Sequence, residues 1–195
     1  MRGPTTADES STSKNDAEAL AQRIAGAPAS TGRIPRDCGD LGIRIARDGT
    51  WYYRGSPIGR KPLVKLFSTV LRRDEAGTFW LVTPVERGRV TVDDAPFVAV
   101  AMTVAGTGTG RILTFTTNLD QTVAAGPDHP IRVAIDDESR APSPYVMMGG
   151  GLEALIARPV FYDLVELGEE RMVDGERVLG VWSGGMFFTI GPMER

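Results

Sequence analysis

The residues best suited to bind a charged ligand lie in one short segment, Gly55-Ser-Pro-Ile-Gly-Arg-Lys-Pro62. Its glycines allow the backbone to turn tightly, and its last proline favours the first turn of a helix. Arg60 and Lys61 place two positive charges beside the free N–H groups that open such a helix. Because these groups bind phosphates and carboxylates, the segment predicts an anion-binding loop. Its candidate ligand-binding residues are Ser56, Gly59, Arg60 and Lys61.

A purely structural role is the alternative for this loop, with glycines that form a turn between a hairpin and a helix and with solvated charges. The spacing excludes the phosphate loop of nucleotide triphosphatases, since three residues separate the two glycines and Pro62 follows the lysine. A magnesium-binding Ser or Thr would be needed at the position of that proline. The loop is therefore expected to recognise a ligand without hydrolysing a nucleotide.

A second glycine run, Gly149 to Gly151, precedes an apolar stretch that we expect to form a short helix from Leu152 to Ile156. Pro159 is expected to end this helix, and residues 160–167 are expected to form a strand. The second group of candidate ligand-binding residues is Gly149, Gly150, Gly151, Arg158, Tyr162 and Trp182. The alternatives are close backbone packing at the glycines, an internal Arg158–Asp163 ion pair and a tryptophan in the core. Tyr53 is a further candidate for stacking on a ligand.

Catalytic and metal-binding groups are scarce. With one cysteine, Cys38, and one histidine, His129, the chain predicts neither a disulfide nor a zinc site nor a histidine-dependent triad. No pair of carboxylates has a spacing that indicates acid–base catalysis, and the sequence does not identify a cofactor. A hydrolase or transferase that uses Asp163 or Glu86 remains an alternative.

Composition restricts the class of partner. The chain has 195 residues, a net charge of −3 and 42% hydrophobic residues, as in ordinary globular proteins. The negative charge argues against a protein dedicated to binding DNA or RNA polymers. The sequence has no signal-peptide pattern and no run of 18 apolar residues, so we expect a cytoplasmic protein without a membrane partner.

The chain is expected to have three parts: a mobile N-terminal tail over residues 1–33, a domain over 34–94 and a domain over 95–195. Within the tail, Ala17, Leu20, Ala21 and Ile24 have helical spacing, so this stretch can fold when it docks. Asp48-Gly49 predicts a tight two-residue hairpin. An amphipathic helix is expected over residues 62–73. Short β-branched runs elsewhere predict antiparallel strands, and hence an α+β fold.

Several motifs resemble the bacterial domain-of-unknown-function family 1285. They are Trp51, Gly55-Ser-Pro-Ile-Gly-Arg-Lys-Pro-Leu63, Trp80-Leu-Val-Thr-Pro-Val-Glu86, Arg158-Pro-Val-Phe-Tyr-Asp163 and Val181-Trp-Ser-Gly-Gly185. The resemblance spans residues 37–191.

This resemblance implies a duplicated core, a C-terminal half similar to the pleckstrin-homology fold, and a ligand site at the junction of the halves. The implied ligand is small and nucleotide-like, with a role in signal transduction. Gly49-Thr-Trp51 and Gly180-Val-Trp182 are candidate equivalents in such a duplication. We therefore expect a regulatory module that binds a small anionic ligand. A protein-interaction module that offers a sheet edge to a partner is the alternative.

Overall fold

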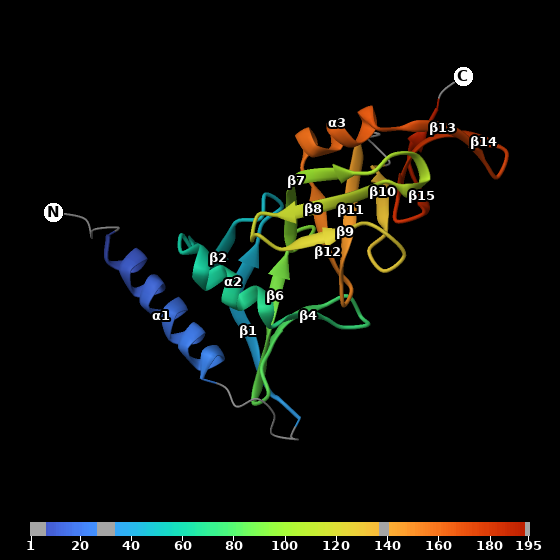
Figure 1. Ribbon diagram of the computed structural model, residues 1–195. Coiled ribbons are helices and arrows are strands. Elements are labelled where there is room, and N and C mark those ends of the chain that lie inside the picture. Colours follow the sequence, from blue (N-terminus) through green and yellow to red (C-terminus); the bar gives the residue numbers. More distant parts are fainter. Residues whose placement is uncertain (1–6, 27–33, 137–140, 194–195) are drawn as a thin grey trace. The chain divides into compact units, whose positions relative to one another are not determined.

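The computed structural model describes residues 7–26, 34–136 and 141–193, with side chains from Asp16 onward. The chain divides into two compact units, unit 1 (Met1–Asp94) and unit 2 (Ala95–Arg195). Each unit is built around a curled six-stranded sheet, and three α-helices and a small third sheet complete the described fold (Figure 1). The expected α+β class is confirmed.

Unit 1 contains two three-stranded meanders that meet through one parallel pair. Its strand order is β3-β2-β1-β6-β5-β4, with β1 parallel to β6 and all other neighbours antiparallel. Its elements are α1 (Ala7–Ala25), β1 (Arg36–Ile45), β2 (Trp51–Tyr53), β3 (Ser56–Pro57), α2 (Lys61–Thr69), β4 (Leu71–Arg73), β5 (Phe79–Val82) and β6 (Glu86–Val92).

The core of unit 1 lies where α2 packs on the sheet. Phe67 of α2 is completely buried and stacks on Trp51 of β2, with ring centroids 6.3 Å apart. Val64, one helical turn earlier, is buried on the same side of the helix. Aromatic burial of this extent is a large source of stability, so this contact holds α2 and the loop before it against β2.

Helix α1 contacts α2, β2 and β3. Its four apolar residues with helical spacing are all buried, as the spacing predicted: Ala17, Leu20, Ala21 and Ile24. Residues 1–33 were expected to be a mobile tail. Its part from Ala7 to Ala25 is helical, and residues 1–6 and 27–33 lie outside the described residues. Two of the four buried side chains are alanines, so the apolar area that this helix buries is small.

Unit 2 contains the second six-stranded sheet, α3 and the third sheet. The strand orders are β10-β11-β12-β7-β8-β9 and β13-β14-β15. Its elements are β7 (Phe97–Ala105), the 3-10 turn η1 (Gly108–Gly110), β8 (Ile112–Thr117), β9 (Thr122–Ala124), β10 (Ile131–Ile135), β11 (Pro142–Gly149), β12 (Leu152–Ile156), α3 (Arg158–Glu166), β13 (Glu169–Val173), β14 (Glu176–Ser183) and β15 (Met186–Pro192).

The two six-stranded sheets have the same strand order when the strands of each are counted along the chain. In both, two three-stranded meanders join through a parallel pair of the first and sixth strands. The helices differ, because α2 lies between the third and fourth strands and α3 follows the sixth. The predicted equivalence of Trp51 and Trp182 is wrong, since Trp182 lies in the third sheet, which has no counterpart among the described strands of unit 1.

Ser183, at the end of β14, joins the third sheet to the larger sheet of unit 2. Its completely buried hydroxyl donates to the carbonyl of Ala125 at 2.7 Å and accepts from the amide of Leu113 at 2.9 Å. The adjacent Gly184 amide donates to the carbonyl of Arg111 at 3.0 Å. Buried backbone groups need such partners, so this single hydroxyl satisfies two backbone groups on separate segments.

Ser183→Ala is expected to lower the free energy of unfolding by about 2 kcal/mol, because it leaves a buried amide and a buried carbonyl without their partner. Equilibrium urea unfolding measures this loss. A change below about 0.5 kcal/mol, the range of ordinary surface substitutions, would contradict the role of the hydroxyl.

Two predicted elements of unit 2 exchange their types. Residues 152–156 were expected to be a helix but form strand β12. Residues 160–167 were expected to be a strand, but all of them except the last belong to helix α3, Arg158–Glu166. Pro159 lies in the first turn of α3, where its missing N–H costs nothing. Leu152–Ile156 contains good helix formers, but pairing with β11 and β7 on both sides overrides that propensity.

Two local predictions in unit 1 are corrected in their bounds. The Asp48-Gly49 hairpin is present, but Ala46–Thr50 connects its strands instead of a two-residue turn, with Ala46 and Thr50 joined by a 2.9 Å backbone hydrogen bond. The expected helix 62–73 ends at Thr69, and Leu71 is a buried strand residue. The apolar period therefore continued past the end of the helix.

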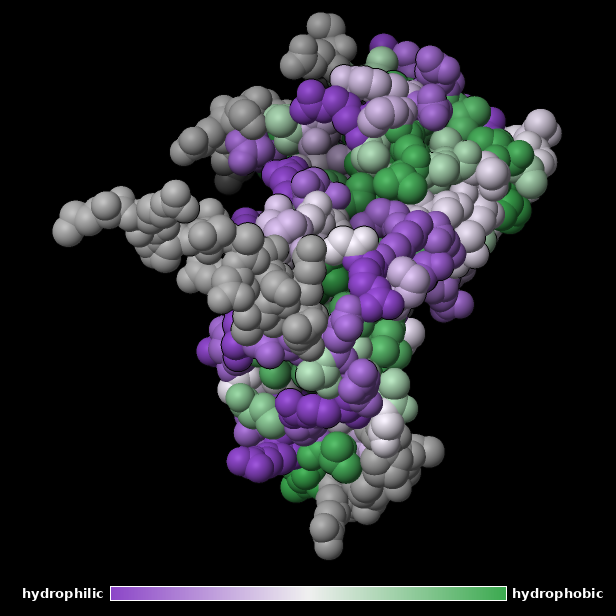
Figure 2. Space-filling view, turned by 90° about the vertical axis from the view of Figure 1, so that its left-hand side faces the viewer, coloured by the Kyte–Doolittle hydropathy of each residue, from purple (hydrophilic) through white to green (hydrophobic). Residues whose placement is uncertain are grey.

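The surface drawn in Figure 2 shows hydrophobic residues in patches with hydrophilic residues between them. Among the helices that the structure describes, no helix has the length and apolarity needed to cross a bilayer.

Candidate functional site

The predicted anion-binding loop is the connection from β2 through β3 to α2. Arg54 and Gly55, with φ angles of 47° and 82°, form a two-residue turn that pairs Tyr53 with Ser56. The Ile58 amide then donates to the Trp51 carbonyl at 2.8 Å, which holds the loop against β2. Positive φ at both central positions is the geometry of the tight hairpin turn, and it directs the chain back toward the start of α2.

Arg60 is the N-cap residue of α2. Its carbonyl accepts from the amides of Leu63 and Val64 at 2.9 and 3.2 Å, and Pro62 lies in the first turn. The first turn contains no acidic residue and the cap has no side-chain hydrogen bond. The positive end of the helix dipole is therefore not offset by a carboxylate of its own helix.

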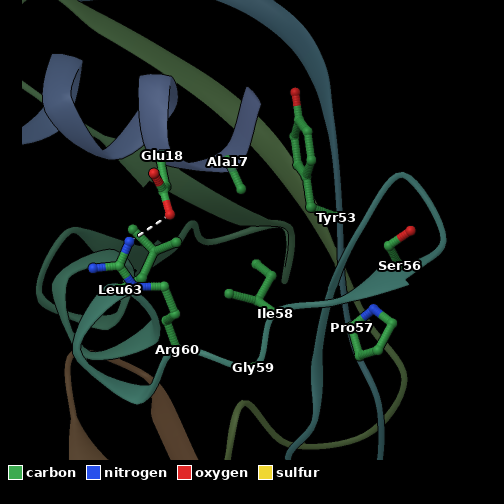
Figure 3. A pocket seen from close by; sticks show the side chains of 9 residues that line it. All are labelled: Ala17, Glu18, Tyr53, Ser56, Pro57, Ile58, Gly59, Arg60 and Leu63. Atoms are coloured by element: carbon green, nitrogen blue, oxygen red, sulfur yellow. Dashed lines mark hydrogen bonds and ion pairs between the residues drawn. The ribbon is translucent and has the colours of Figure 1, made fainter. Parts of the chain in front are cut away.

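This loop forms one side of a pocket of about 240 Å³ (Figure 3). The other side is α1, which contributes Ala17 and Glu18. The nine lining residues are Ala17, Glu18, Tyr53, Ser56, Pro57, Ile58, Gly59, Arg60 and Leu63. Most of these side chains are apolar, and the charges at the wall belong to Arg60 and Glu18. The pocket can therefore hold a molecule with an apolar body and a charged group.

The Arg60 guanidinium donates a hydrogen bond to the Glu18 carboxylate, 42 residues earlier in the chain (Figure 3). The side chains of Arg60 and Glu18 are 69% and 41% exposed, so water and solutes reach the pair. Exposed pairs of this kind contribute little net stability. The guanidinium is thus available to another anion at a small energetic cost.

Two further ion pairs join α1 to the rest of unit 1. The Arg54 guanidinium, whose side chain also lies 5.2 Å from the centroid of the Tyr53 ring, donates to Asp16 at 3.1 Å. Arg23 donates to Glu86, and this hydrogen bond raises the pKa of Arg23 above its ordinary value, with Coulomb attraction to Glu86 adding to the effect. Asp16 and Glu18 of α1 thus meet arginines of the loop region, whereas in the third pair α1 supplies the arginine.

The charge of unit 1 outside α1 favours anions. Residues 34–94 carry 11 Lys and Arg side chains against 8 Asp and Glu, although the whole chain has a net charge of −3. A local excess of positive charge attracts anionic ligands and raises their rate of association.

The structure brings three of the four loop candidates into this pocket, Ser56, Gly59 and Arg60. The fourth, Lys61, is the exposed first residue of α2 and does not line the pocket. Tyr53, expected to stack on a ligand, does line it and is 7% exposed.

The candidates in unit 2 lie on a hairpin, a helix and the third sheet. Gly149 to Gly151 have positive φ angles of 105°, 60° and 75° and form the turn between β11 and β12, so the expected second helix start at these glycines is wrong. Arg158 and Tyr162 are exposed on α3. Trp182 is half-buried beside Phe187, with the guanidinium of Arg171 5.0 Å from its ring centroid. A site that these residues share with unit 1 stays a prediction.

Two of the alternatives considered above were the Arg158–Asp163 ion pair and a tryptophan in the core. No ion pair joins Arg158 to Asp163 among the described residues, because side chains five positions apart in a helix point about 140° apart. Trp182, for which a place in the core was the alternative, is half-buried, whereas Trp51 is a fully buried core residue.

The two carboxylates considered singly for catalysis lie in different units. Asp163 is exposed on α3, and Glu86 is held by Arg23. Within the described residues, no group of three or more His, Cys, Asp or Glu side chains is placed to hold a metal ion.

Sequence reasoning missed the contributions of Glu18 and of the apolar wall residues Ala17, Ile58 and Leu63. The helical spacing of the residues around Ala17 was visible, and it indicated which face of α1 packs. Nothing local in the sequence indicates that Glu18 reaches an arginine 42 positions later, since that contact depends on how α1 packs in unit 1.

Comparisons with known proteins agree on one family. A model described as "Domain of unknown function (DUF1285), N-terminal domain" matches residues 31–95, and one described as "Protein of unknown function (DUF1285), C-terminal domain" matches residues 96–190. A search of curated proteins finds no match.

Two crystal structures are similar to this chain. One is of a DUF1285 family protein from Silicibacter pomeroyi DSS-3, with 46% identity and a TM-score of 0.81, covering 91% of this chain and 95% of that one. The other is of a DUF1285 family protein from Shewanella baltica OS155, with 26% identity and a TM-score of 0.51, covering 65% of this chain and 91% of that one. Since the two family models together span residues 31–190 and the first of these structures covers 91% of the chain at 46% identity, this chain belongs to the DUF1285 family.

Proposed function

We propose that this protein is a regulatory module that binds a small anionic ligand, and that the pocket of unit 1 holds that ligand. The observation that carries the proposal is the position of Arg60, whose guanidinium stands at the wall of an apolar pocket and binds a carboxylate there. An arginine fork recognises carboxylates and phosphates through paired hydrogen bonds. The same geometry suits the anionic group of a ligand.

The apolar wall supports a ligand with a hydrophobic or aromatic part. Tyr53, Ile58 and Leu63 line the pocket, and Arg54 lies over the Tyr53 ring. Pockets for small molecules are mostly apolar, with a few polar groups that fix the orientation of the ligand. At about 240 Å³, this pocket is smaller than the roughly 300–1,000 Å³ of drug-sized sites. The ligand is therefore a small molecule or the anionic end of a larger one, as in a nucleotide.

A thermal-shift experiment tests this function with four probes: adenosine monophosphate, glucose 6-phosphate, benzoate and phenyl phosphate. A ligand at one hundred times its dissociation constant adds about 2.7 kcal/mol of stability, which raises the Tm by several degrees. We expect at least one probe to do so. Arg60→Ala is expected to weaken binding of that probe at least about tenfold, because a charge-assisted hydrogen bond is lost.

Arg44→Ala is the matched control. Arg44 is also an exposed arginine of unit 1 paired with a carboxylate, that of Asp93, but it does not line the pocket. Its removal is expected to leave the ligand-induced shift unchanged. If no probe raises the Tm, or if Arg44→Ala reduces the shift as much as Arg60→Ala, the proposed site is wrong.

A protein-interaction module is the second candidate, and the edge of the third sheet favours it. Among the described strands, β13 pairs with β14 alone, and its Met172 is 67% exposed. An extended segment of a partner can pair with such an edge. If this candidate holds, Met172→Lys weakens binding to a partner protein, whereas Arg60→Ala does not.

A further inference from the structure

We propose that α1 is an internal competitor of the ligand, with the Glu18 carboxylate occupying the position on Arg60 that the anionic group of the ligand takes. This inference rests on the proposed function and adds its regulation. Ligand binding would replace Glu18 on Arg60 and thereby weaken the docking of α1 on unit 1.

The Glu18 carboxylate and the anionic group of a ligand would compete for the same guanidinium. Glu18 and Arg60 line the same pocket, and the Glu18 carboxylate is hydrogen-bonded to the Arg60 guanidinium. This carboxylate is the same kind of group that the pocket is proposed to bind. A ligand anion that approaches Arg60 meets both an occupied donor and a like charge at contact distance, and like charges repel. Binding and the Glu18–Arg60 contact therefore oppose each other.

The described contacts that hold α1 on unit 1 are individually weak. The described part of α1 buries four apolar side chains. Ala17 and Ala21 bury little apolar area, and only Leu20 and Ile24 bury more. In each of the three ion pairs that the part of α1 with described side chains makes, at least one partner is more than half exposed. Exposed ion pairs are individually weak. The loss of one ion pair is thus a substantial part of the described contacts that hold residues 16–25 of α1.

The three ion pairs of α1 reach different parts of unit 1. Glu18 meets the pocket arginine, Asp16 meets Arg54 at the β2–β3 turn, and Arg23 meets Glu86 of β6. Loss of the Glu18–Arg60 ion pair therefore weakens the contact of α1 beside the pocket before it affects the other two ion pairs. The apolar face around Leu20 is then exposed and can bind another surface. Ligand binding would in this way expose α1.

The experiment measures phenyl phosphate binding by calorimetry and α1 docking by hydrogen exchange of the amides in residues 16–25, both on the full chain. Glu18→Gln keeps the size of the side chain and removes its charge. We expect this variant to bind phenyl phosphate about fivefold more tightly than the wild type, and we expect phenyl phosphate to speed α1 exchange in the wild type.

Asp16→Asn is the matched control. It removes the same charge from α1 and breaks an ion pair with Arg54, but Asp16 does not line the pocket. Its effect on phenyl phosphate affinity is expected to stay below about twofold. An equal gain in Asp16→Asn and Glu18→Gln would show a general charge effect and overturn the competition at Arg60.

Two failures are distinguishable. If phenyl phosphate binds the wild type and Glu18→Gln equally and α1 exchange does not change, the competitor role is wrong and the ligand-binding function stands. If phenyl phosphate binds neither protein, the function proposed for the pocket fails for this probe class, and the competitor role fails with it.

Discussion

Phe67→Ala is expected to lower the free energy of unfolding by about 3–5 kcal/mol, the range for removal of a buried aromatic ring. Phe67 has no exposed surface and stacks on Trp51 across the contact between α2 and β2. Folded domains have only about 5–15 kcal/mol of stability in total, so a large part of it depends on this ring. Urea unfolding followed by tryptophan fluorescence measures the loss, because Trp51 lies beside the removed ring.

The same substitution is expected to weaken ligand binding in protein that remains folded. Arg60 and Leu63 belong to the start of α2 and line the pocket, so a helix that shifts on the sheet moves them. Thr69→Ala is the control, because Thr69 is exposed at the end of the same helix and its change is expected to stay within about 0.5 kcal/mol. A loss below about 1 kcal/mol for Phe67→Ala would show that other contacts hold α2 in place.

The pocket loop was predictable because its signals are local. Turn-forming glycines, a proline in the first helical turn and the apolar period of α2 all lie within residues 55–67, and each acts on its nearest neighbours. Ser56, Gly59 and Arg60 consequently line the pocket that the structure contains. The expectation that short β-branched runs form strands had the same local basis, and Ile112–Thr117 and Ile131–Ile135 are two such runs that form strands in the structure.

The secondary structure of residues 152–166 was not predictable from local signals. Leu152–Ile156 has helix-forming residues, and its strand conformation depends on hydrogen bonds to β11 and to β7, which begins 55 residues earlier. Pro159 was interpreted as the end of a helix, although proline is equally suited to the first turn of one. Val160, Phe161 and Leu164 are the buried residues of α3, a spacing that fits a helix.

The same limit applies to the second group of candidate residues. A glycine run before a helix would offer free amides, whereas Gly149 to Gly151 instead connect two antiparallel strands. Without a helix start, their amides lack the aligned dipole that favours an anion. The pocket of unit 1 does not depend on them, so its test is independent of whether they contribute.

The comparison of Gly49-Thr-Trp51 with Gly180-Val-Trp182 shows how similar letters can have different physical roles. Gly49 lies in the β1–β2 connection with a φ of 83°, where glycine is needed for its backbone conformation. Gly180 lies within β14, where the pairing with β15 shifts register, and it is needed because a ring packs on it. The two sheets resemble each other in strand order and not in these residues.

Gly180→Ala is therefore expected to destabilise unit 2 by about 3 kcal/mol, the upper part of the usual range for overpacking. A Cβ at this position would lie 2.4 Å from the Phe187 ring and 2.7 Å from the Phe188 carbonyl oxygen, and the latter is backbone of the paired strand. Gly191→Ala, on β15, is the control, because a Cβ there meets no atom within 4 Å. Urea unfolding of both variants should show a large loss only for Gly180→Ala, and equal losses would show that added strand stiffness, not the contact with Phe187 and Phe188, sets the cost.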